Sequence, residues 1–158
     1  GMAFVWFSDR ARIAGAEAGL RTPYWDWRPR ALGEAFWQYF GGTAPTHHLW
    51  GLAEALQMIL RDEGLEAVWA RHDRLARAVW AAFDAWGQGN PAIALNVADP
   101  DDRGRSVTAA RFGRPDAARL RAWLEAEAAV TLGIGLGMET PGDPQGQGSL
   151  RVAHMGHV

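Results

Sequence analysis

The 158-residue chain contains no cysteine and no lysine. Without cysteine it can form no disulfide, thiolate nucleophile, iron–sulfur cluster or zinc–thiolate site. Without lysine, no side chain can form an internal Schiff base and no Walker-type lysine can bind phosphate. All sixteen basic residues are therefore arginine, and chemistry that needs a side-chain amine is excluded for this chain.

Long hydrophobic runs and a strong net charge are lacking as well. No apolar segment approaches the length that crosses a bilayer, and the start, Gly1-Met2-Ala3-Phe4, has no basic region typical of a secretory signal. A formal net charge of -2 gives no reason to expect a polyanion as partner. We therefore expect no membrane and no nucleic-acid partner, and a cytoplasmic location fits the absence of cysteine.

Apolar and aromatic side chains are plentiful. Apolar residues make up 48% of the sequence and charged residues 22%, which excludes disorder as the dominant state. The length allows one domain with a sizeable core and is too short for two full ones. Nine residues are tryptophan, and most of them should lie in a core or an interface because each ring buries a large apolar area.

The first 62 residues predict the end of an α/β unit. The continuously apolar run at residues 3–8 predicts a strand that is buried on both faces, as in a mainly parallel sheet. Ser8 or Asp9 is the expected N-cap of a helix that begins at Arg10. The other elements predicted here are an irregular stretch at 19–30, a brief helix at 31–39, and a helix of about four turns after Thr46 that stops at Gly64.

The residues that follow predict a small α+β layer. An apolar face recurs along one long helix, which Gly87 closes. Its members are Leu65, Val68, Trp69, His72, Leu75, Val79, Phe83 and Trp86. Beyond it the pattern predicts strands at 93–97 and 106–112, a helix at 116–128, and strands at 130–134 and 149–153. The predicted fold class is α/β plus α+β, in which a long helix precedes a ββαββ segment and a boundary near Asp62 separates residues 1–62 from residues 63–158.

A glycine-rich run at 133–137 resembles half of a dinucleotide-binding fingerprint. That fingerprint needs a strand before the glycines and a helix after them. Here Met138-Glu139-Thr140-Pro141-Gly142 follows, which indicates a loop. We therefore interpret the glycines as positions at which another part of the backbone approaches closely.

The histidines and serines do not form a recognisable catalytic or metal-binding motif. His47 and His48 are adjacent, so on a helix they point about 100° apart and cannot easily share an ion. His154 and His157 flank Gly156, where helical spacing does not apply. None of the serines has the context of a nucleophile elbow. We expect structural histidines and no metal site.

Thr43 is a candidate anion-binding residue. The segment Gly41-Gly42-Thr43-Ala44-Pro45-Thr46 places backbone amides and two hydroxyls just ahead of a predicted helix, where the helix dipole favours a phosphate. The alternative is that Thr43 or Thr46 simply caps the helix, and the spacing alone favours this alternative.

Arg151 is a candidate for carboxylate binding. It lies in a predicted strand between apolar neighbours, and an arginine buried there would need a carboxylate or a phosphate as partner. The alternative is an arginine on an edge strand that points into solvent.

Five segments form a recognisable series along the chain: residues 3–11, 42–46, 52–56, 63–65 and 150–156. Together they resemble the class V aminotransferases, which are pyridoxal-phosphate enzymes of fold type I. They follow the family's order over essentially the whole chain. The branch they most resemble is that of the alanine–glyoxylate and serine–glyoxylate aminotransferases.

The resemblance implies roles for two residues. Thr43 matches the threonine whose hydroxyl contacts the phosphate of pyridoxal 5'-phosphate, across the interface of a homodimer. Arg151 matches the arginine that binds the substrate α-carboxylate through two hydrogen bonds. Phe40 stands where some relatives have a tyrosine that also contacts the phosphate, and without a hydroxyl it cannot do so.

The resemblance also implies that the catalytic lysine lies outside this chain. In the family that lysine precedes the strand matched by residues 3–8, so the chain resembles the C-terminal portion: the last strand and interface segment of the large domain, then most of the small domain. The complete enzyme would move an amino group from a small amino acid such as alanine or serine to glyoxylate or another 2-oxo acid. The chain alone, with no catalytic residue, would be inactive.

Two alternatives stay open beside this hypothesis. A truncated product could dimerise through residues 25–50 without doing chemistry. The chain could also come from a desulfurase or a lyase of the same superfamily, in which Arg151 would still bind a carboxylate.

Overall fold

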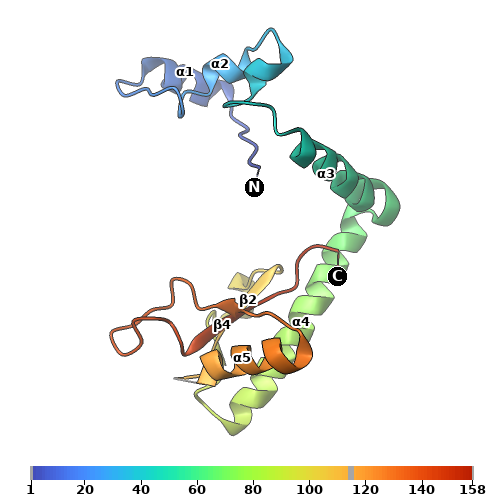
Figure 1. Cartoon of the computed structure of the whole chain (residues 1–158), viewed down its shortest axis with the longest axis vertical. Helices are drawn as coiled ribbons and strands as arrows, with labels where there is room; N and C mark the ends of the chain where they lie inside the picture. The colour runs from blue at the N-terminus through green and yellow to red at the C-terminus, as the bar shows by residue number, and fades with distance from the viewer. Residues whose placement is uncertain (1, 114–115, 158) are drawn as a thin grey trace. The chain divides into compact units, whose positions relative to one another are not determined.

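The computed structural model describes residues 2–113 and 116–157, and Figure 1 shows its ribbon. The chain divides into two compact units, Gly1–Asp62 and Glu63–Val158. What these units are as domains of a larger enzyme stays a prediction.

The first unit is built from short helical segments. They are α1 at Asp9–Glu17, α2 at Arg28–Ala31, the 3-10 helix η1 at Phe36–Tyr39 and α3 at Thr46–Gln57. The π-helix η2 at Met58–Glu63 follows α3 and ends at the boundary between the two units. The Ser8 hydroxyl caps α1 by accepting a hydrogen bond from the Ala11 amide at 3.3 Å, as the sequence predicts.

The brief helix predicted at 31–39 is broken into two pieces. Helix α2 ends at Ala31 and η1 starts at Phe36, with Gly33 between them. A β-carbon at Gly33 would lie 2.8 Å from that of Gln38, so this glycine lets the Gln38 side chain fold back. The Gln38 carboxamide oxygen then accepts from the backbone amides of residues 34 and 35 at 2.6 and 2.8 Å, which stops α2 from continuing.

The strand predicted at residues 3–8 does not form. Phe4 and Val5 are exposed, and Trp6 is 99% exposed. A strand needs a hydrogen-bonded neighbour, and the described residues before Glu63 contain no other strand. The apolar run is therefore an extended segment in which Phe4, Val5 and Trp6 are exposed. The parallel sheet that it would join stays a prediction.

The second unit begins with the long helix α4 at Leu65–Gly89. Gly64 separates it from η2 with a φ of 89°, in the left-handed region that glycine tolerates, which confirms the predicted stop. The helix continues past Gly87 and does not end there as predicted. Gly87 instead makes room for the returning chain, since a β-carbon at this position would lie 2.8 Å from the Ile93 carbonyl oxygen. Neither α4 nor any other described helix is long and apolar enough to cross a membrane.

The buried face of α4 is narrower than the sequence predicts. Val68 and Phe83 are buried as expected, whereas Trp69 and Trp86 are 63% and 53% exposed. Trp80, outside the predicted face, is only 7% exposed. The apolar pattern therefore predicts the helix correctly but does not predict that Trp80, rather than Trp69 or Trp86, is the buried tryptophan.

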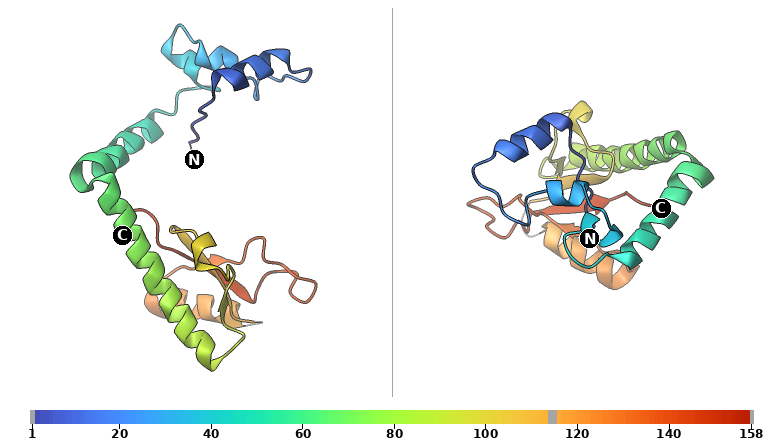
Figure 2. Two further views of the ribbon diagram at one scale, coloured as in Figure 1. Left: turned by 180° about the vertical axis from the view of Figure 1, so that it is seen from behind. Right: turned by 90° about the horizontal axis from the view of Figure 1, so that it is seen from above.

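Figure 2 shows the ribbon from two further sides. In the described part of the second unit, four antiparallel strands and one further α-helix follow α4. They are β1 at Ala94–Leu95, β2 at Val107–Arg111, α5 at Asp116–Ala128, β3 at Gly133–Ile134 and β4 at Ser149–Ala153, with the 3-10 helix η3 at Pro100–Asp102 in the β1–β2 loop. The predicted ββαββ order of elements is confirmed, although β1 and β3 are shorter than predicted. The strand order in the sheet is β1-β2-β4-β3.

The core lies on one face of this sheet. Leu150 of β4 and Ala110 of β2 are fully buried there with Phe83 of α4 and Ala117 of α5. Because side chains alternate along a strand, the residue after Leu150, which is Arg151, projects from the other face. Burial along β2 alternates in the same way.

The glycine-rich run lies against β4, and its close contacts confirm the predicted role. A β-carbon at Gly135 would lie 2.5 Å from that of Ser149 and 3.0 Å from the Gly146 carbonyl oxygen. A residue larger than glycine at position 135 would therefore displace Ser149 and the backbone at Gly146.

We expect Leu150→Ala to lower the free energy of unfolding by about 2–5 kcal/mol, because it opens a cavity in the centre of this core. Chemical denaturation followed by circular dichroism measures the loss. The matched control is Leu136→Ala, which removes the same atoms from a side chain that is 65% exposed and should change stability by less than about 0.5 kcal/mol. Equal losses in the two variants would contradict the assigned core.

Candidate functional site

Arg151 lies in the middle of the sheet. Strand β4 pairs with β2 on one side and with β3 on the other, so the alternative of an arginine on an edge strand is wrong. The Arg151 Nε donates a hydrogen bond of 2.8 Å to the Ile134 carbonyl oxygen. This bond fixes the guanidinium against β3 while the side chain stays partly exposed.

The outer edge of the Arg151 guanidinium is available to a ligand. No carboxylate among residues 2–113 and 116–157 forms an ion pair with it, and its bond to Ile134 engages Nε alone. A guanidinium presents two parallel N–H groups that match the two oxygens of a carboxylate. The position can therefore bind a small carboxylate in the two-pronged manner.

Three other arginines of the second unit form ion pairs with carboxylates. Arg71 forms two hydrogen bonds of 2.8 Å to the Glu63 carboxylate, and these lower the pKa of Glu63. Arg77 and Arg105 share the Asp73 carboxylate at 2.6 and 2.8 Å, and their hydrogen bonds lower its pKa. These pairs are structural, which distinguishes them from Arg151.

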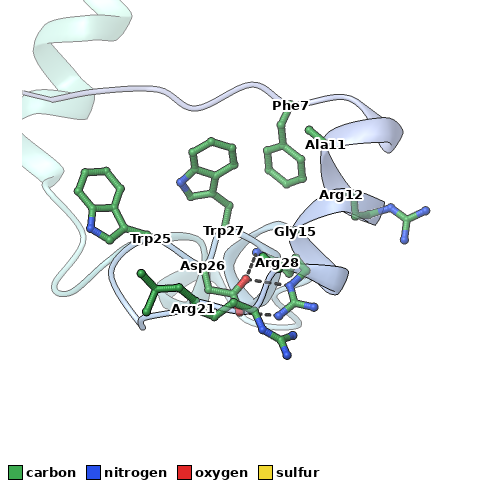
Figure 3. A pocket seen from close by; sticks show the side chains of 11 residues that line it. Phe7, Ala11, Arg12, Gly15, Arg21, Trp25, Asp26, Trp27 and Arg28 are labelled. Atoms are coloured by element: carbon green, nitrogen blue, oxygen red, sulfur yellow. Dashed lines mark hydrogen bonds and ion pairs between the residues drawn. The ribbon is translucent and has the colours of Figure 1, made fainter.

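The first unit contains a hollow that is lined by aromatic and charged residues (Figure 3). The sequence pattern does not predict this hollow. The rings of Phe7 and Trp27 lie 5.6 Å apart on one side of it. Arg28 holds Asp26 through side-chain hydrogen bonds of 2.9 and 2.7 Å, which lower the pKa of Asp26 to about 2. Since this carboxylate and this guanidinium satisfy each other, the hollow presents neither for chemistry.

Thr43 is exposed and lies in a bend between η1 and α3. The N-cap residue of α3 is Pro45, and no side chain caps this helix, so the interpretation of Thr43 or Thr46 as a cap is wrong. Within the described part of the chain the Thr43 hydroxyl has no hydrogen-bond partner. It is therefore available to an external phosphate.

Arg30 adds a positive charge beside this segment. A β-carbon at Gly41 would lie 3.5 Å from an outer nitrogen of the Arg30 guanidinium. The same guanidinium donates to the carbonyl oxygens of Tyr24 and Pro23, both at 2.9 Å. The sequence shows no pattern that would bring Arg30 to Gly41, so it was missed.

Phe40 contributes a ring and no polar contact. It is partly buried, and its ring lies edge-on to that of Phe36 with centroids 5.0 Å apart. Any phosphate at this segment would therefore depend on Thr43 and the neighbouring backbone. Thr43 belongs to the first unit and Arg151 to the second.

A buried polar network, absent from the sequence-based prediction, supports the end of β4. The Trp80 indole donates to the Thr108 hydroxyl at 2.9 Å, and this hydroxyl lies 2.9 Å from the His154 Nε2. The His154 Nδ1 lies 3.1 Å from the Arg105 carbonyl oxygen. A carbonyl only accepts, so Nδ1 carries the proton and Nε2 accepts from Thr108. In this arrangement Thr108 accepts from Trp80 and donates to His154; a protonated Nε2 would instead donate to the Thr108 oxygen and leave the Thr108 O–H without this acceptor.

The histidines have structural or exposed positions. Burial lowers the pKa of His154 below 6.5, and His72 lowers it further. His47 and His48 are exposed at the start of α3. The described residues contain no cluster of three or more histidine and acidic side chains that could hold a metal ion.

We expect the stability of the chain to fall as the pH falls below about 6.5. The unfolded state then binds a proton at His154 that the folded state binds only at lower pH, so the stabilisation is complete above pH 6.5 and is lost towards the folded-state pKa. His154→Gln should remove this part of the pH dependence, whereas His48→Gln at an exposed position should keep it. Urea denaturation between pH 5 and 8 measures both. Parallel profiles for the wild type and His154→Gln would contradict the neutral network.

Comparison with known proteins relates the chain to aminotransferases. It is 40% identical over 111 residues, 70% of its length, to an L-aspartate–glyoxylate aminotransferase of Paracoccus denitrificans. It is 33% identical over 90 residues, 57% of its length, to a serine–glyoxylate aminotransferase of Arabidopsis thaliana. No family model matches the chain. The matches cover 26% and 22% of these two proteins, so the chain spans about a quarter of the length of the curated relatives.

Proposed function

We propose that this chain is the C-terminal portion of a class V aminotransferase that depends on pyridoxal 5'-phosphate and transfers an amino group from a small amino acid to glyoxylate or another 2-oxo acid. The observation that carries the proposal is the free outer edge of Arg151 at the centre of the sheet. The names of two relatives, both glyoxylate aminotransferases, support the reaction.

In this function Arg151 binds the carboxylate that the amino acid and the 2-oxo acid have in common. Its bond to Ile134 holds Nε in place, so the two N–H groups of the outer edge, one on each terminal nitrogen, are oriented before the substrate arrives. Two hydrogen bonds then fix the orientation of the carboxylate and of the adjoining α-carbon. Such positioning aligns the α-hydrogen for removal and lowers the entropic cost of reaction.

Thr43 contributes to cofactor binding in the proposal. Its free hydroxyl donates to a phosphate oxygen, and Arg30 beside Gly41 adds a positive charge near the same segment. The resemblance places this contact across a homodimer interface. Exposed aromatic side chains in the first unit, among them Trp25 at 69% and Trp50 at 77% exposure, are consistent with a surface that a second subunit covers.

The residues of this chain fit only part of the cofactor. Thr43 suits its phosphate and Arg151 the substrate carboxylate, but no lysine is present to bind its aldehyde. When bound, pyridoxal 5'-phosphate supplies the electron sink of the reaction. The lysine must come from elsewhere in the complete enzyme, and the chain alone is proposed to be inactive.

The amino donor is proposed as alanine or serine, and aspartate is the natural third test. The two relatives share glyoxylate in their names and differ in the donor. Assays with each donor at a fixed glyoxylate concentration compare the values of kcat/KM.

We expect the purified chain, mixed with pyridoxal 5'-phosphate and reduced with borohydride, to gain no cofactor mass at any specific side chain, because it has no lysine. The natural gene product should have a subunit mass well above 17.3 kDa and should gain one cofactor. Intact-mass spectrometry measures both. A site-specific adduct on this chain, or a natural product of 17.3 kDa, would overturn the proposal.

In the complete enzyme we expect Arg151→Lys to lower kcat/KM for glyoxylate by about 10–100-fold, because a charge-assisted pair of hydrogen bonds is replaced by a point charge. Arg119→Lys is the matched control, since Arg119 is an exposed residue of α5. Steady-state kinetics with glyoxylate and alanine measure the effect. Equal values of kcat/KM in the two variants would contradict the proposed role of Arg151 in binding the substrate.

A further inference from the structure

We propose that Gly133 is a positioning residue for Arg151: its missing side chain lets the guanidinium lie flat along β3 and present its outer edge to a carboxylate. This inference rests on the proposed function of Arg151. It adds a residue that never touches the substrate and acts only through the arginine.

Gly133 lies directly opposite Arg151 in the antiparallel pairing of β3 and β4. A β-carbon built at Gly133 would lie 3.3 Å from both Cβ and Nε of Arg151, and 3.5 Å from one of its outer nitrogens. The guanidinium therefore occupies the space that a side chain at this position would fill. From there Nε reaches the carbonyl oxygen of the next residue, Ile134, at 2.8 Å.

The backbone itself does not require glycine here. Positive φ angles occur at Gly137 and Gly146 nearby but not at Gly133. An alanine or a valine at Gly133 can adopt strand geometry, where valine is favoured. The cost of a side chain thus falls on Nε and the outer nitrogen of Arg151, which can swing away, and in smaller part on its Cβ, where β3 and β4 must separate by a few tenths of an ångström.

The opposite neighbour of Arg151 is small as well. Ala109 of β2 faces Arg151 in the pairing of β2 with β4. Side chains directly opposite each other on one face of a sheet are in contact range, so both neighbours on this face leave room around the guanidinium. A small carboxylate can approach the outer edge without first displacing a side chain of either neighbour.

The test follows the Arg151 Nε–H signal by NMR in the full 158-residue chain labelled with ¹⁵N. Gly133→Ala and Gly133→Val form a graded series, because alanine presses on Nε and valine adds two methyl groups. Gly142→Ala and Gly142→Val are the controls, since a β-carbon at Gly142 meets nothing within 4 Å. We expect the Nε–H signal to shift and to exchange faster with solvent in the Gly133 variants, and to stay unchanged in the controls.

Titration with sodium acetate, against sodium chloride at equal ionic strength, then tests carboxylate binding. The wild type should show an acetate-dependent shift of the Arg151 signal. Gly133→Ala should weaken acetate binding about threefold and Gly133→Val about tenfold, in line with the loss of one hydrogen bond that orders the arginine. The urea midpoints of the Gly133 variants should fall only slightly, and the loss of acetate binding should exceed what that small fall explains.

Each outcome decides between the two claims. If the wild type responds to acetate and the Gly133 variants respond equally, the positioning role of Gly133 is wrong while the carboxylate role of Arg151 stands. If acetate does not shift the Arg151 signal in the wild type, the proposed substrate role of Arg151 fails and the inference fails with it. If the fall in the urea midpoint explains all of the weaker binding, Gly133 acts on the fold and the positioning role is overturned.

Discussion

The pairing of β4 with a strand on each side is the constraint on which the second unit depends. It sets the register that turns Leu150 into the core and Arg151 towards the opposite face. A slip of one residue would exchange these two side chains, burying a charge and exposing the centre of the core. The core and the position of the Arg151 guanidinium therefore depend on the same register.

Small residues allow this strand to be packed so closely. Gly135 approaches Ser149, and Gly146 approaches Gly135, within distances that exclude a β-carbon, and these contacts lie where β4 begins. At its other end His154 is tied to α4 through Thr108 and Trp80. Arg151 lies between these two anchored ends, which explains how one long, flexible side chain can have a defined position.

Prediction from the sequence succeeded where local pattern and tertiary structure agree. The strand at 149–153 and the helix at 116–128 match β4 and α5, because a glycine-rich loop and an acidic first turn mark their ends. It failed at residues 3–8, since an apolar run becomes a strand only where partners exist. It also missed Trp80 and Arg30, because their contacts join positions that no periodicity connects.

The sequence names candidate site residues by type, and their roles stay a prediction, whereas their geometry comes from the structure. Arg151 and Thr43 were found from sequence, whereas the central place of β4, the free edge of the guanidinium and the uncapped start of α3 required the structure.

The most direct measurement is an experimental structure of the complete enzyme with an unreactive substrate-like carboxylate bound. The account predicts that both oxygens of this carboxylate lie about 2.7–2.9 Å from the outer nitrogens of Arg151, with Nε still on the Ile134 carbonyl. A carboxylate bound elsewhere, with Arg151 directed into solvent, would contradict it.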